Sequence, residues 1–105
     1  MRNNELIERA LRRIVLPRYE KAIDVSVHTT FDEIEDNGIY YSSVIYVVIY
    51  KWESANKTLN KENKIRIIDD TISVFTMFNF DKGPNEDFRP AINVDFEYLY
   101  EDGQD

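Results

Sequence analysis

Hydrophobic and polar positions in the first part of the chain recur at the spacing of a helix. Apolar residues follow one another at intervals of three and four and form one stripe, made of Leu6, Ile7, Ala10, Leu11, Ile14 and Val15. Asn3 or Asn4 can cap the start of this helix, and Pro17 disfavours helical geometry at Leu16. The pattern predicts an amphipathic helix that ends or kinks near Leu16.

From Ile23 onward the period changes to two, which is the spacing of a strand with one buried face. One side carries Ile23, Val25, Val27, Thr29 and Phe31, and the other side carries Asp24, Ser26, His28 and Thr30. The pair Asn37 and Gly38 tolerates positive φ, so it predicts an antiparallel reversal after this strand.

The segment from Ile39 to Trp52 is apolar on both faces. Such a run is typical of a central strand covered on both sides, so we expect Val48 and Ile49 to be buried on opposite sides. Its aromatic side chains share one face: Tyr40, Tyr46, Tyr50 and Trp52. Core packing and a protein-binding surface both explain this face, because tyrosine and tryptophan combine a large apolar area with a polar tip.

Two further segments have the composition of strands. The segment from Lys64 to Phe80 is rich in β-branched and aromatic residues, which favours strand over helix. Asp69 and Asp70 interrupt it and mark a bulge, a bend or a turn that divides it into two strands. From Ile92 to Tyr100 apolar and polar residues alternate, and acidic residues on the polar face are typical of an edge strand.

These elements predict one α+β domain, in which an N-terminal amphipathic helix packs on a four- to five-stranded, mainly antiparallel sheet. A length of 105 residues suits a single core. The expected parts of the domain are a basic helical segment over 1–21, an acidic sheet over 22–100 and a frayed tail over 101–105.

Charge is divided unevenly along the chain. Residues 1–21 carry six basic and three acidic side chains, and the other 84 residues carry seven basic and seventeen acidic ones. The net charge of the chain is therefore −7. The basic end attracts anions and the acidic body repels them. Arg9, Arg12 and Arg13 lie off the apolar stripe, where they either grip phosphates or a partner's carboxylates or pair with acidic residues of the chain itself.

Residues that carry catalytic or metal chemistry are scarce. The chain has no cysteine and one histidine, which excludes disulfides and thiolate metal sites. The sequence fixes no partner for His28. The acidic residues of 32–36 lack the spacing of a calcium loop, and the tripeptide Glu62 to Lys64 lacks the carboxylates of a metal-dependent nuclease. No catalytic residue, cofactor or metal is therefore predicted.

The chain also shows no sign of membrane insertion or export. No apolar run approaches the roughly 18 residues that indicate a membrane span, and no signal peptide is recognisable. We therefore expect a cytoplasmic location, in the host cell or in a virion if a phage encodes the chain. Its richness in asparagine, lysine, isoleucine, aspartate and tyrosine fits a phage or other mobile element with an AT-rich genome.

These observations favour a non-enzymatic, acidic interaction protein that works by protein–protein contact, such as a self-assembling structural or assembly subunit of a phage or mobile element. The alternative is a nucleic-acid-mimicking inhibitor of a host nucleic-acid-binding enzyme, for example an anti-defence protein. In both cases the partner is a protein, either copies of the chain or a host protein with a basic surface, with no membrane and no direct nucleic-acid binding. The residues predicted to bind this partner are Arg9, Arg12, Arg13, Asp69, Asp95, Glu97, Tyr98 and Tyr100.

Overall fold

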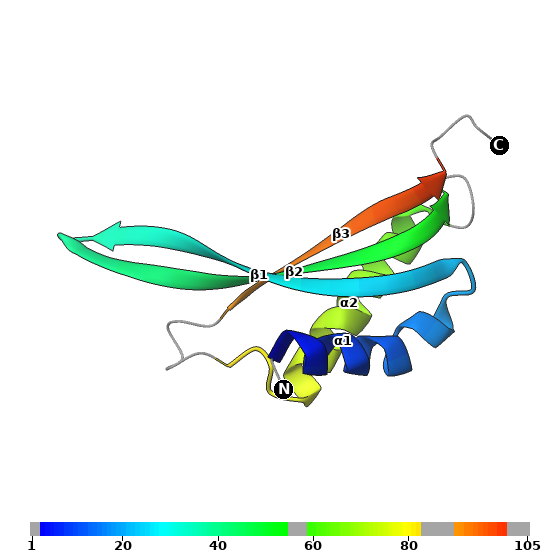
Figure 1. The fold of residues 1–105 in the computed structure, drawn as a ribbon, viewed down its shortest axis with the longest axis horizontal. Coiled ribbons are helices and arrows are strands. Elements are labelled where there is room, and N and C mark those ends of the chain that lie inside the picture. Colours follow the sequence, from blue (N-terminus) through cyan, green and yellow to red (C-terminus); the bar gives the residue numbers. More distant parts are fainter. Residues whose placement is uncertain (1–2, 55–58, 83–89, 101–105) are drawn as a thin grey trace.

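The fold of the chain consists of two helices on a three-stranded sheet (Figure 1). A computed structural model describes residues 3–54, 59–82 and 90–100. The elements in chain order are α1 (Asn3–Ile14), a 3-10 turn (Leu16–Arg18), β1 (Ala22–Asp36), β2 (Ile39–Ser54), α2 (Lys61–Met77) and β3 (Ala91–Tyr100). The helix predicted to end near Leu16 is confirmed as α1, which stops at Ile14 before the turn that contains Pro17.

The sheet has the order β1-β2-β3. β1 and β2 form an antiparallel hairpin, and its turn places Asn37 at φ 52° and Gly38 at φ 80°, as the sequence predicts. β3 lies beside β2 in the parallel direction, because α2 carries the chain back to the start of the sheet. The α+β class, the N-terminal helix and the mainly antiparallel sheet are confirmed. The prediction of four to five strands is wrong, since the described residues form three.

The missing strands correspond to α2, because the strand predicted over Lys64 to Phe80 is a helix. The Asn60 side chain caps its start by accepting a hydrogen bond from the Asn63 N–H at 2.8 Å. Its buried residues recur at helical spacing: Ile67, Thr71, Val74 and Phe75. Their packing against the sheet outweighs the strand preference of the individual residues. Asp69 and Asp70 are therefore helical residues and do not mark a bulge, bend or turn.

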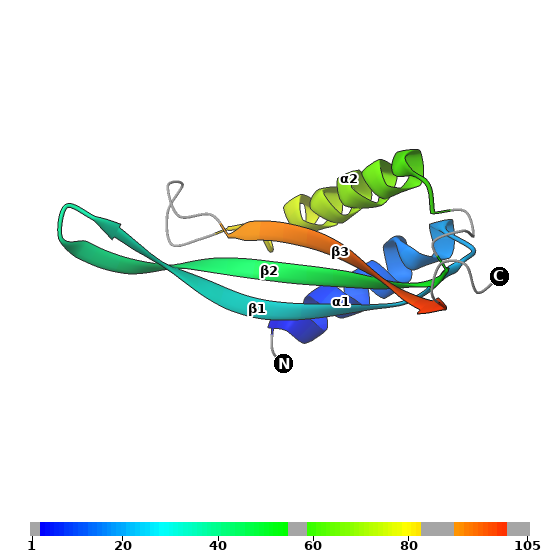
Figure 2. The ribbon, with the colours of Figure 1, turned by 90° about the horizontal axis from the view of Figure 1, so that it is seen from above.

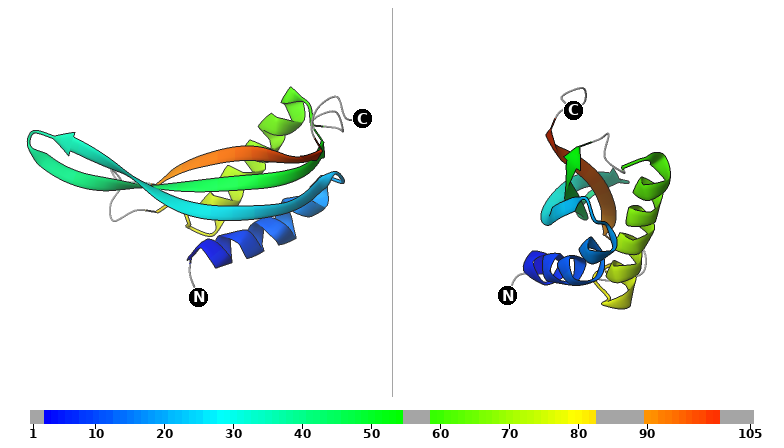
Figure 3. Two further views of the ribbon diagram at one scale, coloured as in Figure 1. Left: turned by 45° about the horizontal axis from the view of Figure 1, so that its top comes forward. Right: turned by 90° about the vertical axis from the view of Figure 1, so that its right-hand side faces the viewer.

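Both helices cover the same face of the sheet, as two further views show (Figures 2 and 3). The core between these layers contains Ile7, Leu11, Val15, Val25, Val27, Tyr46, Val48, Tyr50, Trp52, Leu59, Ile67, Val74 and Phe75. Tyr46, Tyr50 and Trp52 are thus core residues. β2 is central, but the prediction that it is covered on both sides is wrong. Val48 is fully buried, whereas Ile49 on the opposite face is only half-buried.

β1 begins with an irregularity in its pairing to β2. The register shifts between Ala22 and Asp24, so Ile23 leaves the alternation and is 48% exposed. The predicted inward position of Ile23 is therefore wrong. Val25 and Val27 point into the core as predicted.

The hairpin continues past the helices as a long arm (Figure 1). β3 begins opposite Ile45, which pairs with Thr30 of β1, so residues 31–44, which we call the arm, form a ribbon of two strands only. The arm explains why the molecule measures 52 Å along its longest axis but only 27 and 25 Å across. Phe31 is 62% exposed and Tyr40 is 72% exposed there, although their alternation places them on the face that the helices cover elsewhere.

Candidate ligand-binding site

A groove of about 390 Å³ runs between α1 and the turn that follows α2. Its lining residues are Leu6, Arg9, Ala10, Arg13, Ile14, Phe78 and Phe80. Leu6, Ala10 and Ile14 lie four residues apart and form an apolar row along α1, and Arg9 and Arg13 form a parallel row beside it. One helix therefore supplies both an apolar wall and a positively charged rim.

The opposite wall is the turn after α2. Asn79 takes a left-handed conformation with φ 59°, and the Phe80 N–H donates to the Phe75 carbonyl oxygen at 2.8 Å. The Phe80 ring stacks on Phe78 with centroids 5.6 Å apart and meets the edge of the buried Phe75 ring at 6.1 Å. The turn is thereby anchored to the core, and it keeps a phenylalanine pair in the groove.

Arg9 and Arg13 form no ion pair with any residue that the structure describes. Both side chains are exposed. They also border a second hollow, whose other lining residues are Glu5, Glu8 and Arg12 of the same helix. Their guanidinium groups are therefore available to an anion at the edge of an apolar groove.

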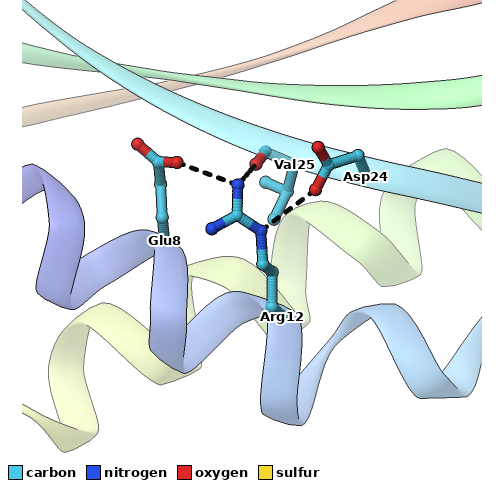
Figure 4. A network of polar contacts seen from close by, with 4 residues as sticks. All are labelled: Glu8, Arg12, Asp24 and Val25. Atoms are coloured by element: carbon cyan, nitrogen blue, oxygen red, sulfur yellow. Dashed lines mark hydrogen bonds and ion pairs between the residues drawn. The ribbon is translucent and has the colours of Figure 1, made fainter.

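Arg12, the third predicted arginine, is instead bound within the chain (Figure 4). Its guanidinium lies 3.1 Å from Glu8 and 3.0 Å from Asp24, and it also donates to the Val25 carbonyl oxygen at 3.1 Å. The hydrogen bond with Asp24 raises the pKa of Arg12. A backbone hydrogen bond at Val25, followed by the bond from Arg12, lowers the pKa of Asp24. Arg12 thus fixes α1 to β1 and is not free for a ligand.

The contact between Asp24 and Arg12 predicts a small loss of stability in acid. Since the pKa of Asp24 is lower in the folded state, its contribution is present above the ordinary aspartate pKa and is lost as the pH falls through the folded value. Both side chains are about half exposed, so we expect Asp24→Asn to cost less than about 1 kcal/mol at neutral pH. Urea unfolding of both proteins checks this, and the cost should disappear in acid. A cost that persists unchanged at low pH would contradict the assignment.

A second polar cluster joins the 3-10 turn to α2. The Tyr19 hydroxyl donates to Asp70 at 2.7 Å, and Arg18 lies 3.2 Å from the other oxygen of that carboxylate. Burial, and then the bond to Asp70, raises the pKa of Tyr19 to about 12. Both oxygens of Asp70 are engaged by side chains of the chain itself, so this cluster serves the packing of the turn.

The acidic and aromatic residues predicted to bind a partner do not form one surface. Asp69 is exposed on α2, whereas Asp95 and Glu97 lie on β3 in alternation with the half-buried Val94 and Phe96, and so face away from the helices. Tyr98 and Tyr100 lie at the end of β3, where they are 37% and 53% exposed. His28 is exposed on β1, and no metal-binding cluster of histidine and acidic residues exists within the described ranges.

The groove was not predicted from the sequence, because Phe78 and Phe80, which line it, lie in the segment that was wrongly predicted as a strand. The sequence does contain two indications of a helix. Asn60 can cap a helix, and Ile67, Val74 and Phe75 after it recur at helical spacing.

No helix in the described part of the chain is long and apolar enough to cross a membrane.

No protein-family model and no curated protein sequence matches the chain. Solved structures with a similar fold include an organic hydroperoxide resistance protein from Elizabethkingia anophelis, with 12% identity and a TM-score of 0.51. The match covers 90% of this chain and 61% of the other, so this chain spans less than two thirds of that protein. Two more are OhrB of Bacillus subtilis and an OsmC protein from Legionella pneumophila, each with 12% identity and a TM-score of 0.49. Each match covers 90% of this chain, together with 62% of the Bacillus protein and 61% of the Legionella protein.

This similarity concerns the fold, and it corrects the interpretation drawn from charge. The chain folds like a protein named for resistance to organic hydroperoxides. That finding contradicts the prediction of a non-enzymatic interaction protein from a phage or mobile element. It also contradicts the alternative of a nucleic-acid-mimicking inhibitor, and with it the prediction that the chain is not an enzyme. The charge distribution did not indicate the fold, because many unrelated folds carry an acidic surface.

Proposed function

We propose that the chain binds organic acids with an unbranched alkyl chain, including acids that carry a hydroperoxide group, in the groove between α1 and the turn after α2. The observation that carries this proposal is the pairing of an apolar groove with two arginines that have no acidic partner among the described residues. The alkyl chain would lie along the apolar walls, and the carboxylate would meet the guanidinium groups at the rim.

The dimensions and chemistry of the groove support this ligand class. Small-molecule sites usually measure roughly 300 to 1,000 Å³ and combine apolar walls with a few polar groups that orient the ligand. At about 390 Å³, the groove lies within that range. Leu6 is 39% exposed and Phe78 is 46% exposed, so an alkyl chain laid between them would remove apolar surface from water.

The arginines support a carboxylate at one end of the ligand. Arginine presents a planar fork that matches a carboxylate, and bonds between charged groups are about twice as strong as those between neutral groups. Arg9 and Arg13 are one helical turn apart, so their guanidinium groups can approach one ligand head from neighbouring positions.

The hydroperoxide group enters the proposal through the fold similarity to the Elizabethkingia protein. Reduction of a hydroperoxide to an alcohol consumes two electrons and two protons, and a chain without cysteine has no thiol to supply the electrons. The activity proposed for the groove is therefore recognition of the organic acid.

Calorimetric titration with dodecanoic acid, dodecanol, linoleic acid hydroperoxide and cumene hydroperoxide tests the proposal. We expect the two acids to bind and the two ligands without a carboxylate to bind at least about tenfold more weakly, because a hydrogen bond to a charged group contributes roughly 1.5 to 3 kcal/mol. The double variant Arg9→Gln/Arg13→Gln should bind the two acids as weakly as the natural chain binds dodecanol.

A matched control is Arg66→Gln, which removes an exposed arginine on α2 that pairs with Glu62. This variant should bind dodecanoic acid like the natural chain. Equal binding of the acid and the alcohol, or an equal loss in both arginine variants, would refute the carboxylate site.

A further inference from the structure

The outer side of α1 combines exposed arginines with an exposed leucine. At about 3.6 residues per turn, Leu6, Arg9 and Arg13 point away from the side of the helix that buries Ile7 and Leu11. Arg9 and Arg13 are exposed, and Leu6 is 39% exposed. α1 therefore presents positive charge and apolar surface to the solvent on one side.

The end of α2 extends this surface. Met77 is 64% exposed and lies two helical turns after Asp70, so the two share one side of α2. That side faces the end of α1, because Asp70 binds Tyr19 and Arg18 of the segment that follows α1. Phe78 is 46% exposed and lines the groove opposite α1. The basic-apolar surface, as we call it, consists of Leu6, Arg9, Arg13, Met77 and Phe78.

A large share of the acidic side chains lies in other parts of the molecule. Positions 22–50 carry five acidic residues and no lysine or arginine, and Asp95 and Glu97 project from the sheet face opposite the helices. Asp81 and Lys82, after α2, carry opposite charges side by side. Figure 1 shows α1 and the end of α2 together on one side of the molecule, with β3 on the other. An anionic surface therefore attracts the chain through α1 and repels it through the sheet and the arm.

We infer that the basic-apolar surface binds the surface of an anionic lipid bilayer. Arg9 and Arg13 meet the lipid phosphates, and Leu6, Met77 and Phe78 enter the headgroup region. The chain carries −7 in all, but charges on its far side are screened over roughly 8 Å at physiological ionic strength. The expectation of no membrane partner rested on the absence of a spanning segment, which contact with the bilayer surface does not need.

The bilayer would also supply the proposed ligand, and in that respect the inference rests on the proposed function. Organic acids with long alkyl chains dissolve in bilayers, because their apolar surface leaves water there. The groove lies between Leu6 and Phe78, which both belong to the basic-apolar surface. A chain bound in this orientation turns its groove toward the lipid in which such acids collect.

Flotation with lipid vesicles tests the charge part of the inference. The natural chain should bind vesicles of phosphatidylcholine and phosphatidylglycerol at least about tenfold more strongly than vesicles of phosphatidylcholine alone. Arg9→Gln/Arg13→Gln should lower binding to the anionic vesicles about twenty-fivefold, because each arginine near such a surface contributes about fivefold. Arg66→Gln, on α2, should bind as the natural chain does. High salt should release the natural chain from the anionic vesicles.

Charge placed among the apolar side chains tests the orientation. Met77→Glu should lower binding to the anionic vesicles at least about tenfold, because a carboxylate then faces the lipid phosphates. The matched control is Ile65→Glu, which changes a residue that is 51% exposed on the same helix. It lies twelve positions before Met77, about 18 Å along the axis, so screening should leave its vesicle binding nearly unchanged.

A variant that should gain binding guards against misfolding as the cause of a loss. Glu5 is exposed on α1, one turn before Arg9, and has no ion pair with a described residue. Glu5→Gln removes a negative charge beside the arginines, so it should bind the anionic vesicles about fivefold more strongly. An unfolded chain would not show this gain together with the far-ultraviolet spectrum of the natural chain.

The outcomes separate the membrane contact from the proposed ligand site. Equal binding to both kinds of vesicle, or equal losses in Met77→Glu and Ile65→Glu, would overturn the membrane contact even if dodecanoic acid binds. Release of the chain from the vesicles by an excess of soluble glycerol phosphate would also overturn it, because the site then takes a free phosphate. Met77 does not line the groove, so Met77→Glu should still bind dodecanoic acid. Vesicle binding that follows the expected pattern in a chain that does not bind dodecanoic acid would support the membrane contact and count against the ligand site.

Discussion

Replacement of Phe75 by alanine is expected to lower the free energy of unfolding by about 3 to 5 kcal/mol. The ring is fully buried and lies between Tyr46, at 5.6 Å, and Phe80, at 6.1 Å. Phe75→Ala therefore leaves a cavity between α2, β2 and the turn that forms one wall of the groove. Because Phe80 loses its contact, dodecanoic acid should also bind more weakly to this variant.

Urea unfolding measures this loss, with Ile65→Ala as the control on the same helix. Ile65 is 51% exposed, so its replacement should change the free energy of unfolding by less than about 0.5 kcal/mol. Similar losses in the two variants would show that α2 does not pack on the sheet through Phe75.

The second large effect concerns a buried pair of hydroxyl groups. The Thr71 hydroxyl donates to the Ile67 carbonyl oxygen at 2.6 Å, so the Tyr50 hydroxyl must donate to Thr71, at 2.7 Å. Both side chains are fully buried, and burial raises the pKa of Tyr50. Thr71→Val leaves the Tyr50 hydroxyl without a partner, which should cost about 1 to 3 kcal/mol.

Tyr50→Phe should cost less, about 1 kcal/mol, because Thr71 keeps its bond to Ile67. The double variant Tyr50→Phe/Thr71→Val should be more stable than Thr71→Val alone, since no buried hydroxyl then lacks a partner. Chemical unfolding of the three variants measures this. Additive losses would contradict the assigned direction of the two hydrogen bonds.

The elements whose sequence patterns were complete could be predicted. α1 combines an uninterrupted apolar stripe with Pro17 beyond its end, and the β1–β2 hairpin combines alternation with Asn37 and Gly38. α2 was predicted as a strand because its isoleucine, valine and phenylalanine residues prefer strands, while its helical form depends on contacts with Tyr46 and Tyr50 across the core. Such contacts do not exist in the local sequence.

The candidate site could be predicted only in part, for the same reason. Because Arg9, Arg12 and Arg13 lie on one helix, an anion site was one of two interpretations of the sequence. Arg12 is not available to an anion, because Asp24 of β1 binds it. Arg9 and Arg13 border an apolar groove, because α2 and its turn bring Phe78 and Phe80 beside α1. These relations arise from tertiary packing.

A nuclear magnetic resonance titration with dodecanoic acid, which maps the bound ligand on the chain, tests most directly whether the groove is the binding site. If the acid binds in the groove, the methyl signals of Leu6, Ala10 and Ile14 and the side-chain N–H signals of Arg9 and Arg13 should show saturable shifts. Signals of His28, Asp95 and Glu97, on the sheet face opposite the helices, should not change. Saturable shifts confined to that opposite face, or no shifts in the groove, would show that the groove does not bind the acid.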